Sequence, residues 1–242
     1  MDPFYFNAKP GDKIPLFDSH CHLQYSDYDH DRDEVIKRAK NAGLTHIICV
    51  GTDLEESKKA LDLANQYPDF IYATVGNHPY QADKSIQGFA ELIKNNPTKI
   101  VAIGETGLDY FKSPIDHETQ KESFKKHCEL AVKFDLPVII HLREIEDCFE
   151  DALQILQETN CQKAIFHSFT GSLQMAQKVW SHNYKTSFSL MLTYPKNAEL
   201  REVYKACPPH LKLHETDGPY LPPQNKRGVR NEAGFVVELL EL

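Results

Sequence analysis

The chain has 242 residues, of which 41% are hydrophobic and 26% charged, the composition of a globular protein with one large domain or two small ones. It contains no apolar run long enough to span a membrane, and its first residues lack the basic and apolar stretches of a signal peptide, so we expect neither a membrane span nor a signal peptide. The net charge of −8 argues against a broad basic surface for nucleic acid, although bound divalent cations can supply positive charge locally.

A short apolar strand followed by an amphipathic helix recurs eight times along the chain. This alternation indicates parallel strands, and eight such units close into a (β/α)8 TIM barrel, which we expect to be a single domain over residues 1–242 with a lead segment 1–13. An open doubly wound sheet is the alternative, but no glycine-rich phosphate loop follows the first strand. The predicted strands are residues 14–18, 44–50, 70–75, 99–103, 137–141, 163–167, 184–190 and 211–215. The predicted helices are residues 31–42, 53–66, 84–95, 117–134, 146–158, 172–181, 196–206 and 229–242.

The segment FDSHCHL at residues 17–23 places two histidines one residue apart after the first predicted strand. Side chains of an extended chain alternate between two faces, so His20 and His22 share a face with Asp18, whereas Phe17 and Cys21 point the other way. Two neutral imidazoles this close are suited to share a cation, although a pair of surface histidines near a turn is the alternative.

The six cysteines are scattered along the chain and include no C-x-x-C pair. This spacing favours reduced thiols in a cytoplasmic protein over a disulfide framework. Because Cys21 has the opposite parity to the two histidines beside it, we do not expect it to be a metal ligand.

Polar residues also follow five later strands, and active sites of this barrel type lie at the C-terminal ends of the strands. His141 has the parity of Ile139, and His167 that of Ile165, so each continues an inward-facing apolar column to the barrel mouth. The same alternation places Glu105 in line with Val101 and Ile103, and Glu215 and Asp217 in line with Leu211 and Leu213.

Four histidines and two carboxylates at one barrel mouth would be a costly polar cluster without a cation. Nitrogen and oxygen ligands without a thiolate suit Zn, Mn, Co or Mg better than a structural zinc cage. One catalytic site needs about three protein ligands, so six ligands point to two divalent ions with Glu105 bridging them. The candidate ligands are His20, His22, His141 and His167, together with Glu105 and an acid at the end of the eighth strand, Glu215 or Asp217.

Six segments in order resemble the TatD-like metal-dependent deoxyribonuclease family of the amidohydrolase barrel superfamily: DSHCHL, GNHP, AIGETGLDY, PVIIHLRE, FHSFTG and HETDGPYLPP. The resemblance covers residues 16–232, and the family's metal positions carry over to six predicted ligands: His20, His22, Glu105, His141, His167 and Asp217. It implies a (β/α)8 barrel and metal-dependent hydrolysis of phosphodiester bonds in DNA, commonly as a 3′-to-5′ exonuclease. The expected partner is therefore DNA, either single-stranded DNA or the 3′ end of a strand.

The chain departs from this family in two places. Family chains continue beyond FVVELLEL, so we expect a short last helix. The strand before ETD is normally apolar, whereas this one contains Lys212 and His214, both with outward parity. A barrel wall beside a short covering helix would tolerate such outward polar residues.

The predicted catalytic residues are Asp217, which takes a proton from the attacking water, and Glu105. His78 and Arg143 are predicted phosphate contacts, although His78 could instead make a turn hydrogen bond and Arg143 an ion pair with a helix carboxylate. Further predicted substrate contacts are Asp109, Tyr110 and Glu215. Glu215 could instead make a hydrogen bond to a turn. Tyr110, Phe111 and Phe169 are candidates to stack a terminal base, with loop packing as the alternative.

Two other functions stay open. A hydrolase of a small amide, ester or lactone would use the same barrel and ligands, although many members of that superfamily carry a carboxylated lysine on the fourth strand, where this chain has Glu105. A metal-binding scaffold without activity is weaker, because every ligand position is intact. The sequence leaves open which metal binds, DNA against RNA, the direction of digestion and the oligomeric state, with a monomer as the simplest assembly.

Overall fold

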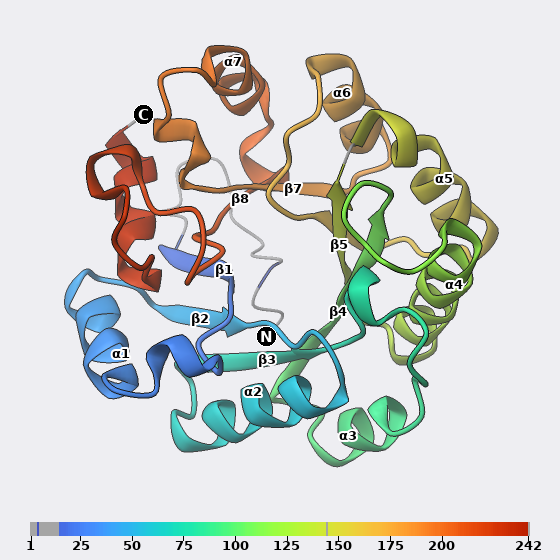
Figure 1. Cartoon of the computed structure of the whole chain (residues 1–242), viewed down its shortest axis with the longest axis horizontal. Helices are drawn as coiled ribbons and strands as arrows, with labels where there is room; N and C mark the ends of the chain where they lie inside the picture. Colours follow the sequence, from blue (N-terminus) through green and yellow to red (C-terminus); the bar gives the residue numbers. More distant parts are fainter. Residues whose placement is uncertain (1–3, 5–14, 144, 242) are drawn as a thin grey trace.

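The computed structural model describes residues 4, 15–143 and 145–241, so the predicted lead segment 1–13 lies outside the described residues except for Phe4. Eight parallel strands form one sheet in the order β1 to β8, and the helices surround this ring (Figure 1). The predicted (β/α)8 barrel is therefore confirmed. The strands are β1 (Phe17–Cys21), β2 (His46–Cys49), β3 (Ile71–Val75), β4 (Ile100–Asp109), β5 (Val138–Arg143), β6 (Ala164–Phe166), β7 (Lys185–Phe188) and β8 (Lys212–His214).

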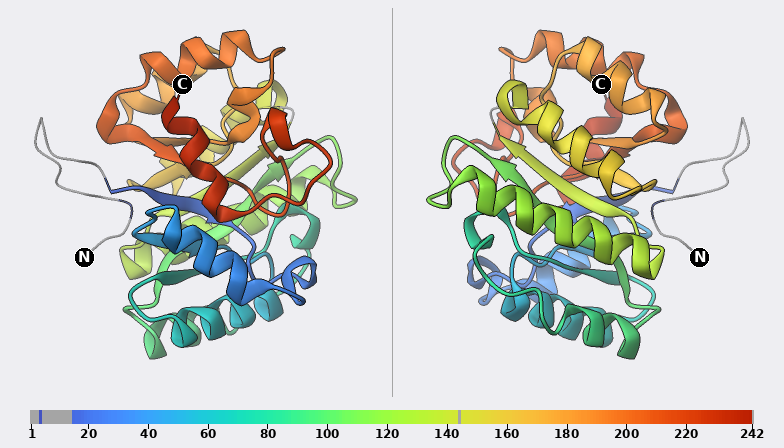
Figure 2. Two further views of the ribbon diagram at one scale, coloured as in Figure 1. Left: turned by 90° about the vertical axis from the view of Figure 1, so that its left-hand side faces the viewer. Right: turned by 90° about the vertical axis from the view of Figure 1, so that its right-hand side faces the viewer.

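Helices separate consecutive strands and form the outer layer. The α-helices are α1 (Arg32–Asn41), α2 (Leu54–Gln66), α3 (Phe89–Asn95), α4 (His117–Phe134), α5 (Ile145–Glu158), α6 (Leu173–Ser181) and α7 (Ala198–Ala206). Shorter 3-10 helices are η1 (Ser26–Tyr28), η2 (Pro79–Gln81), η3 (Leu190–Thr193), η4 (Pro209–Leu211) and η5 (Gln224–Lys226), and η6 (Ala233–Glu241) is the last element. From the sides, the strands cross the middle of the molecule between helices (Figure 2).

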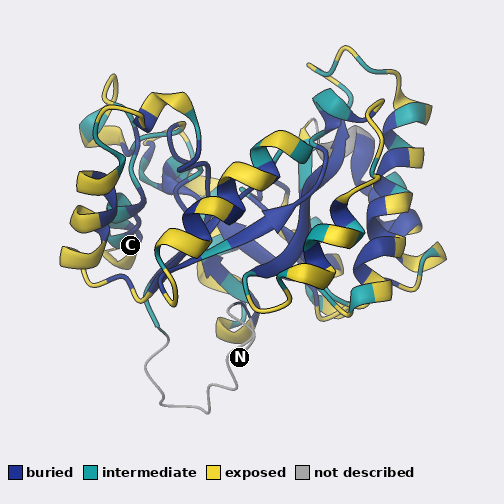
Figure 3. Ribbon diagram, turned by 90° about the horizontal axis from the view of Figure 1, so that it is seen from below, coloured by how far each residue is buried: buried dark blue, intermediate teal, exposed yellow. Residues whose placement is uncertain are grey.

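The strands are buried, whereas the outer faces of the helices are exposed (Figure 3). One apolar cluster fills the barrel interior and includes Phe17, Val101, Ile139 and Ile165. A larger cluster lies between the sheet and the helices. Fully burying one such side chain contributes about 1.5–3 kcal/mol, so the two layers hold the strand ends in fixed positions.

Side-chain caps fix where several helices begin. The Asp53 carboxylate accepts from the Glu56 backbone N–H at 2.9 Å at the start of α2, and Asp116 accepts from the Thr119 N–H at 2.9 Å at the start of α4. Such caps contribute about 1 kcal/mol each. The cap of α2 also positions the first turn of that helix beside the barrel mouth.

The seam between β1 and the segment after β8 closes the barrel. The Asp217 N–H donates to the His20 carbonyl at 2.9 Å, and the His22 N–H donates to the Gly218 carbonyl at 2.7 Å. The Asp18 carboxylate accepts from the Thr216 N–H at 2.9 Å and from its hydroxyl at 2.5 Å. These bonds join the strand that carries the two histidines to the loop that carries Asp217.

The first strand differs from its prediction. It begins at Phe17 and includes His20, whereas the prediction ended it at residue 18. Phe17 packs in the interior cluster, although alternation with His20 predicted the opposite face. The register of β1 against β2 is irregular between Asp18 and Cys21, so an interrupted alternation lets both Phe17 and His20 face inward.

The fourth strand is longer than predicted and also breaks alternation. It runs through Asp109, so Glu105 lies within the strand and not after it. Ile103, predicted to face inward, packs in the outer cluster, while Val101 is interior. Gly104 has φ +136°, a conformation that L side chains rarely adopt, and a Cβ there would lie 2.6 Å from the Ile139 carbonyl oxygen. Glycine at this position therefore permits the backbone path that turns Glu105 toward the mouth.

Two helices also differ from prediction. The third begins at Phe89 and not at residue 84, because residues 78–84 form η2 and a following turn and Gly88 precedes the helix with φ +100°. The last helix is a 3-10 helix. Its buried residues Ala233, Val236 and Leu239 recur every third position, which matches three residues per turn. It lies between α7 and α1 in the outer ring (Figure 1).

The outward direction of Lys212 and His214 is confirmed. The His214 Nε2 lies 2.9 Å from the Tyr204 hydroxyl of α7, and the Lys212 ammonium lies 4.0 Å from the centre of the Tyr204 ring. Burial lowers the pKa of His214 to about 4. One tyrosine thus covers both polar residues on the outside of β8.

None of the helices in the described part of the chain is long and apolar enough to cross a membrane.

Candidate metal centre and substrate cavity

The structure brings the six predicted metal ligands together at one end of the barrel. They come from β1, β4 and β5 and from the positions just after β1, β6 and β8. Five of them line a cavity of about 720 Å³: His22, Glu105, His141, His167 and Asp217. His20 is 1% exposed and contacts Glu105 and Asp217 below the cavity.

Glu105 lies at the centre of this cluster. Its Oε2 is 3.4 Å from His20 Nε2 and 3.7 Å from His22 Nε2. Its Oε1 is 2.9 Å from both His141 Nδ1 and His167 Nε2. Oε1 also lies 3.7 Å from His78 Nε2, so each oxygen of the carboxylate faces a different set of imidazoles, an arrangement in which a carboxylate can bridge two ions.

The donor atoms are close enough to hold ions. In the described residues, three sets of three donor atoms each lie within 4.8 Å of one another. None of these sets contains a cysteine, in keeping with the nitrogen and oxygen set expected from the sequence. The sets are His20, His22 and Asp217; His20, Glu105 and His167; and His78, Glu105 and His141.

Unpaired buried nitrogen atoms fit a metal centre. Among the described residues, neither ring nitrogen of His20 has a hydrogen-bond partner. A buried polar atom without a partner costs about 1–3 kcal/mol, and coordination to a cation would remove that cost at His20 Nε2. The residues present therefore fit divalent ions.

Charges within the cluster compensate one another. Burial would raise the pKa of Glu105, but the neighbouring His167, His78 and His141 hold it well below its usual range. Burial would lower the pKa of His167, but the carboxylates of Glu105 and Glu215 raise it well above its usual range. The carboxylates thus require positive charge beside them, which protons or cations can supply.

Three site histidines are oriented by a second partner. His22 Nδ1 lies 2.9 Å from the Val50 carbonyl, so this nitrogen donates and Nε2 presents its lone pair to the site. His141 Nε2 lies 3.5 Å from an Asp109 oxygen. His167 Nδ1 lies 3.3 Å from a Glu215 oxygen. Each ring is therefore held with its other nitrogen toward Glu105 or Asp217.

Asp109 and Glu215 do not lie where substrate contacts would be. Both are 0% exposed, and neither lines the cavity. Asp109 accepts from the backbone N–H of Phe111 and Lys112, and Glu215 accepts from the Ser187 hydroxyl. We therefore correct their predicted role: they orient His141 and His167 from behind.

The residues predicted to stack a terminal base do not line the cavity either. Tyr110 stacks on His117 at 3.8 Å and donates to Asp151, so its ring belongs to the outer layer. Phe169 is 2% exposed. Phe111 is exposed but does not line the cavity. The loop-packing alternative is therefore the better description of Tyr110 and Phe169.

His78 and Arg143 do line the cavity. Arg143 Nε lies 3.3 Å from Asp109, with a side chain 42% exposed. His78 Nδ1 accepts from the Tyr80 N–H at 3.2 Å, and burial lowers its pKa to about 3. The ring is therefore neutral with its proton on Nε2, which lies 3.7 Å from Glu105 and can donate at the cavity.

Three tyrosines that the sequence analysis did not single out line the cavity: Tyr25, Tyr80 and Tyr220. Tyr25 and Tyr220 stand in loops after β1 and β8, and Tyr80 lies in η2, which follows β3. Their only sequence signal is that each follows a strand after which a metal ligand or a phosphate contact was predicted.

Removing the Asp18 carboxylate is expected to destabilise the protein. Asp18→Ala leaves the buried Thr216 N–H and hydroxyl without their acceptor, which costs about 2–4 kcal/mol. For a chain of this size, the melting temperature should fall by about 5–15 °C. Asp62→Ala, on the exposed face of α2, is the matched control and should change it little. Equal melting temperatures for Asp18→Ala and wild type would show that the seam does not depend on this carboxylate.

The sequence matches the model of the family described as TatD related DNase over residues 17–242. The chain is 38% identical over 232 residues to the uncharacterized metal-dependent hydrolase YabD of Bacillus subtilis, covering 93% of this chain and 89% of the relative. It is 32% identical over 235 residues to the 3′-5′ ssDNA/RNA exonuclease TatD of Erwinia tasmaniensis, covering 93% and 90%.

The fold is likewise similar to that of the TatD homologue YjjV from Escherichia coli. The TM-score is 0.84 at 31% sequence identity, with 93% of this chain and 87% of that chain covered. Since the family match spans nearly the whole barrel and the predicted ligands meet at its mouth, the chain belongs to the TatD-related DNase family of metal-dependent hydrolases.

Proposed function

We propose that this protein hydrolyses phosphodiester bonds of DNA and removes nucleotides from the 3′ end of single strands, with two divalent ions at the Glu105 cluster. The observation that carries the proposal is that the two Glu105 oxygens face different sets of imidazoles: Oε2 faces His20 and His22, and Oε1 lies closest to His141 and His167. The relative from Erwinia tasmaniensis carries the name 3′-5′ ssDNA/RNA exonuclease, which supports this substrate class and direction.

His20, His22 and Asp217 would hold one ion, and His141 and His167 the other, with Glu105 shared. Divalent cations at these positions, whether Mg, Mn, Zn or Co, supply positive charge that lowers the pKa of a water toward about 7 and neutralises charge on the phosphate.

Asp217 is the residue that accepts the proton of the attacking water. Its side chain is 16% exposed and reaches the cavity, and its Oδ1 lies 3.6 Å from His22 Nε2. Burial would raise the pKa of Asp217, but the neighbouring imidazoles of His22, His20 and His167 lower it, so the carboxylate is ionised and ready to accept.

The phosphate is held by side chains on the other side of the cavity. Arg143 offers a planar set of donors that suits phosphate oxygens, and the neutral His78 offers its Nε2–H. Lys112, in the loop after β4, adds a further cation to the lining. These donors fix the scissile group without taking part in proton transfer.

Chelation is expected to abolish hydrolysis. Protein dialysed against EDTA should lose activity on single-stranded DNA, and added Mg, Mn, Co or Zn should restore some of it, because the cluster then regains its positive charge. Release of labelled nucleotides measures the result, and EDTA already saturated with Mg is the control. Full activity after exhaustive chelation would contradict the metal-dependent mechanism.

A substrate panel separates the proposed function from its alternatives. Single-stranded DNA labelled at either end, RNA, bis(p-nitrophenyl) phosphate and an acyl ester are compared with and without metal. Mononucleotide release from the 3′ end supports the proposal. Turnover of the acyl ester alone would indicate an amidohydrolase-type hydrolase of small amides, esters or lactones, and metal binding without any turnover would indicate a scaffold.

A further inference from the structure

The walls of the cavity differ in chemistry from side to side. Arg143 ends β5 and Lys112 follows β4, so the cations lie on the β4–β5 side. Tyr25, Glu56 and Tyr220 follow β1, β2 and β8, three neighbouring strands across the ring (Figure 1). A nucleic-acid strand crossing this mouth therefore meets cations on one side and aromatic rings with a carboxylate on the other.

Tyr25 and Tyr220 form an aromatic corner. Their ring centres are 6.5 Å apart, and the ring planes meet at 72°. Tyr25 also stacks on the site histidine His22 at 4.7 Å and 8°. Tyr220 is 52% exposed, so its ring is available to a planar ligand. Base stacking on such a ring is tolerant of sequence because every base has a π face.

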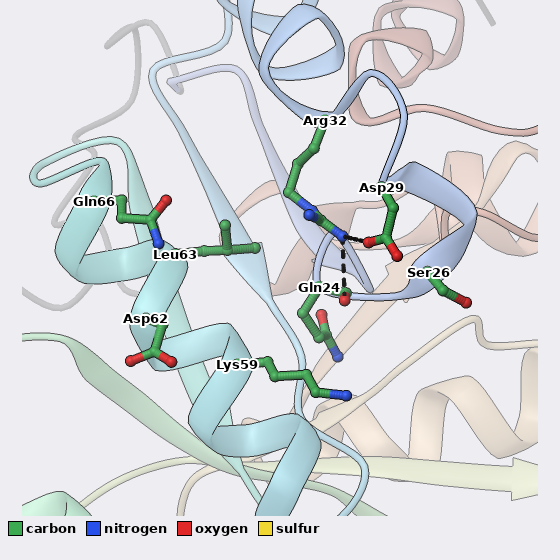
Figure 4. A pocket seen from close by; sticks show the side chains of 8 residues that line it. All are labelled: Gln24, Ser26, Asp29, Arg32, Lys59, Asp62, Leu63 and Gln66. Carbon is green, nitrogen blue, oxygen red and sulfur yellow. Dashed lines mark hydrogen bonds and ion pairs between the residues drawn. The ribbon is translucent and has the colours of Figure 1, made fainter.

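Backbone contacts hold both tyrosines in place. Arg32 donates to the carbonyls of Leu23 at 2.7 Å and Tyr25 at 3.0 Å, beside a polar hollow of about 290 Å³ between α1 and α2 (Figure 4). The Tyr220 carbonyl accepts from the buried Asn231 amide at 2.6 Å. The loops are thus fixed before a ligand binds, which lowers the entropic cost of binding.

Glu56 places a carboxylate on the same side of the cavity as Tyr25 and Tyr220. Its Oε1 pairs with Lys59 at 2.8 Å, while Oε2 is buried and has no hydrogen-bond partner among the described residues. The Tyr25 hydroxyl lies 3.1 Å from the Thr52 hydroxyl, and Thr52 lines the cavity with Glu56. The Glu56 side chain is 22% exposed and lines the cavity, so its carboxylate can accept from a ligand hydroxyl, and its negative charge repels a phosphate.

We propose that the Tyr25, Glu56 and Tyr220 side of the cavity is a subsite for the terminal nucleotide of a strand that ends in a free 3′-hydroxyl. The base stacks on Tyr220 against the edge of Tyr25, and Glu56 accepts from the hydroxyl. The rest of the strand leaves past Lys112 and Arg143. This subsite rests on the proposed nuclease function and explains why a strand end, and not an interior phosphate, would enter.

The hydroxyl contact is tested with two single-stranded oligonucleotides of the same sequence, one ending in a 3′-hydroxyl and the other in a 3′-phosphate. Wild type should prefer the hydroxyl end in kcat/KM, and Glu56→Gln should reduce that preference by at least about tenfold, because the charge that repels phosphate is gone. Glu55→Gln is the matched control: it pairs with the same Lys59 at 3.2 Å but does not line the cavity. An unchanged preference in Glu56→Gln, or an equal change in Glu55→Gln, overturns the assignment of Glu56.

The stacking contact is tested with oligonucleotides whose 3′-terminal residue carries a base or is abasic. Wild type should cleave the base-bearing end about tenfold better, equivalent to about 1.4 kcal/mol. Tyr220→Ala should bring this ratio close to one, and Tyr220→Phe, which keeps the ring, should restore it. An unchanged ratio in Tyr220→Ala overturns the subsite while leaving the nuclease function intact. Failure of wild type to cleave any DNA, with turnover of another substrate, overturns the proposed function itself.

Discussion

Replacement of Glu105 by glutamine is expected to lower the rate of phosphodiester hydrolysis by at least about a hundredfold, equivalent to about 2.7 kcal/mol of transition-state stabilisation. The amide keeps the shape of the side chain but removes the negative charge that both pairs of imidazoles face, so metal affinity should fall as well. Turnover of bis(p-nitrophenyl) phosphate and metal content of the purified variant measure the two effects.

The Glu105→Gln protein should stay folded, because the residue stands at the barrel mouth above the apolar interior. Circular dichroism and a melting curve check this expectation. Glu118→Gln, on the exposed start of α4 with a side chain 82% exposed, is the matched control and should keep wild-type turnover. A Glu105→Gln variant with a near-normal rate would show that this carboxylate does not bridge two ions.

Asp217→Asn is expected to reduce turnover by about 10²–10⁴-fold while changing nucleic-acid binding little, because the amide cannot accept the proton of the attacking water. Single-turnover kinetics and the affinity for a labelled oligonucleotide separate the two quantities. Retained turnover in Asp217→Asn would assign the base to another residue.

Arg143→Ala is the complementary variant. Its guanidinium lies at the cavity and touches Asp109, but a guanidinium has no lone pair to offer a metal ion. We therefore expect weaker oligonucleotide binding with metal content intact. Loss of metal in Arg143→Ala would mean that the contact between Arg143 and Asp109 supports the metal ligand His141. The predicted phosphate role of Arg143 would then be wrong.

Side-chain alternation predicts the inward or outward direction of a residue correctly only where the strand is regular. In β5 and β6, Ile139 and Ile165 are interior, and His141 and His167 face the mouth as predicted. In β1 and β4 the register shifts, so Phe17 and Ile103 lie on the faces opposite to those predicted. His20 and Glu105 nevertheless face the site. Their direction depends on local irregularities such as the one at Gly104, which alternation cannot express.

The roles of the buried carboxylates needed the three-dimensional arrangement. Glu215 and Asp217 are two residues apart, and side-chain alternation predicts that both face the barrel mouth. The Glu215 carboxylate is held beneath the cavity by Ser187 and His167, whereas the Asp217 carboxylate reaches the cavity. Which of two nearby acids meets solvent depends on partners from β6 and β7, far away in the chain.

The sequence by itself determined the barrel, the family and the end of the strands at which polar side chains gather, because strand and helix periodicity and short local motifs carry that information. Only the tertiary structure decided which oxygen of Glu105 faces which imidazoles, which acids stand behind the histidines and which tyrosines border the cavity. Those features arise from contacts between loops and strands that are distant in the chain. A seam such as Asp18 with Thr216 leaves no local pattern, since its two halves are separated by nearly the whole barrel.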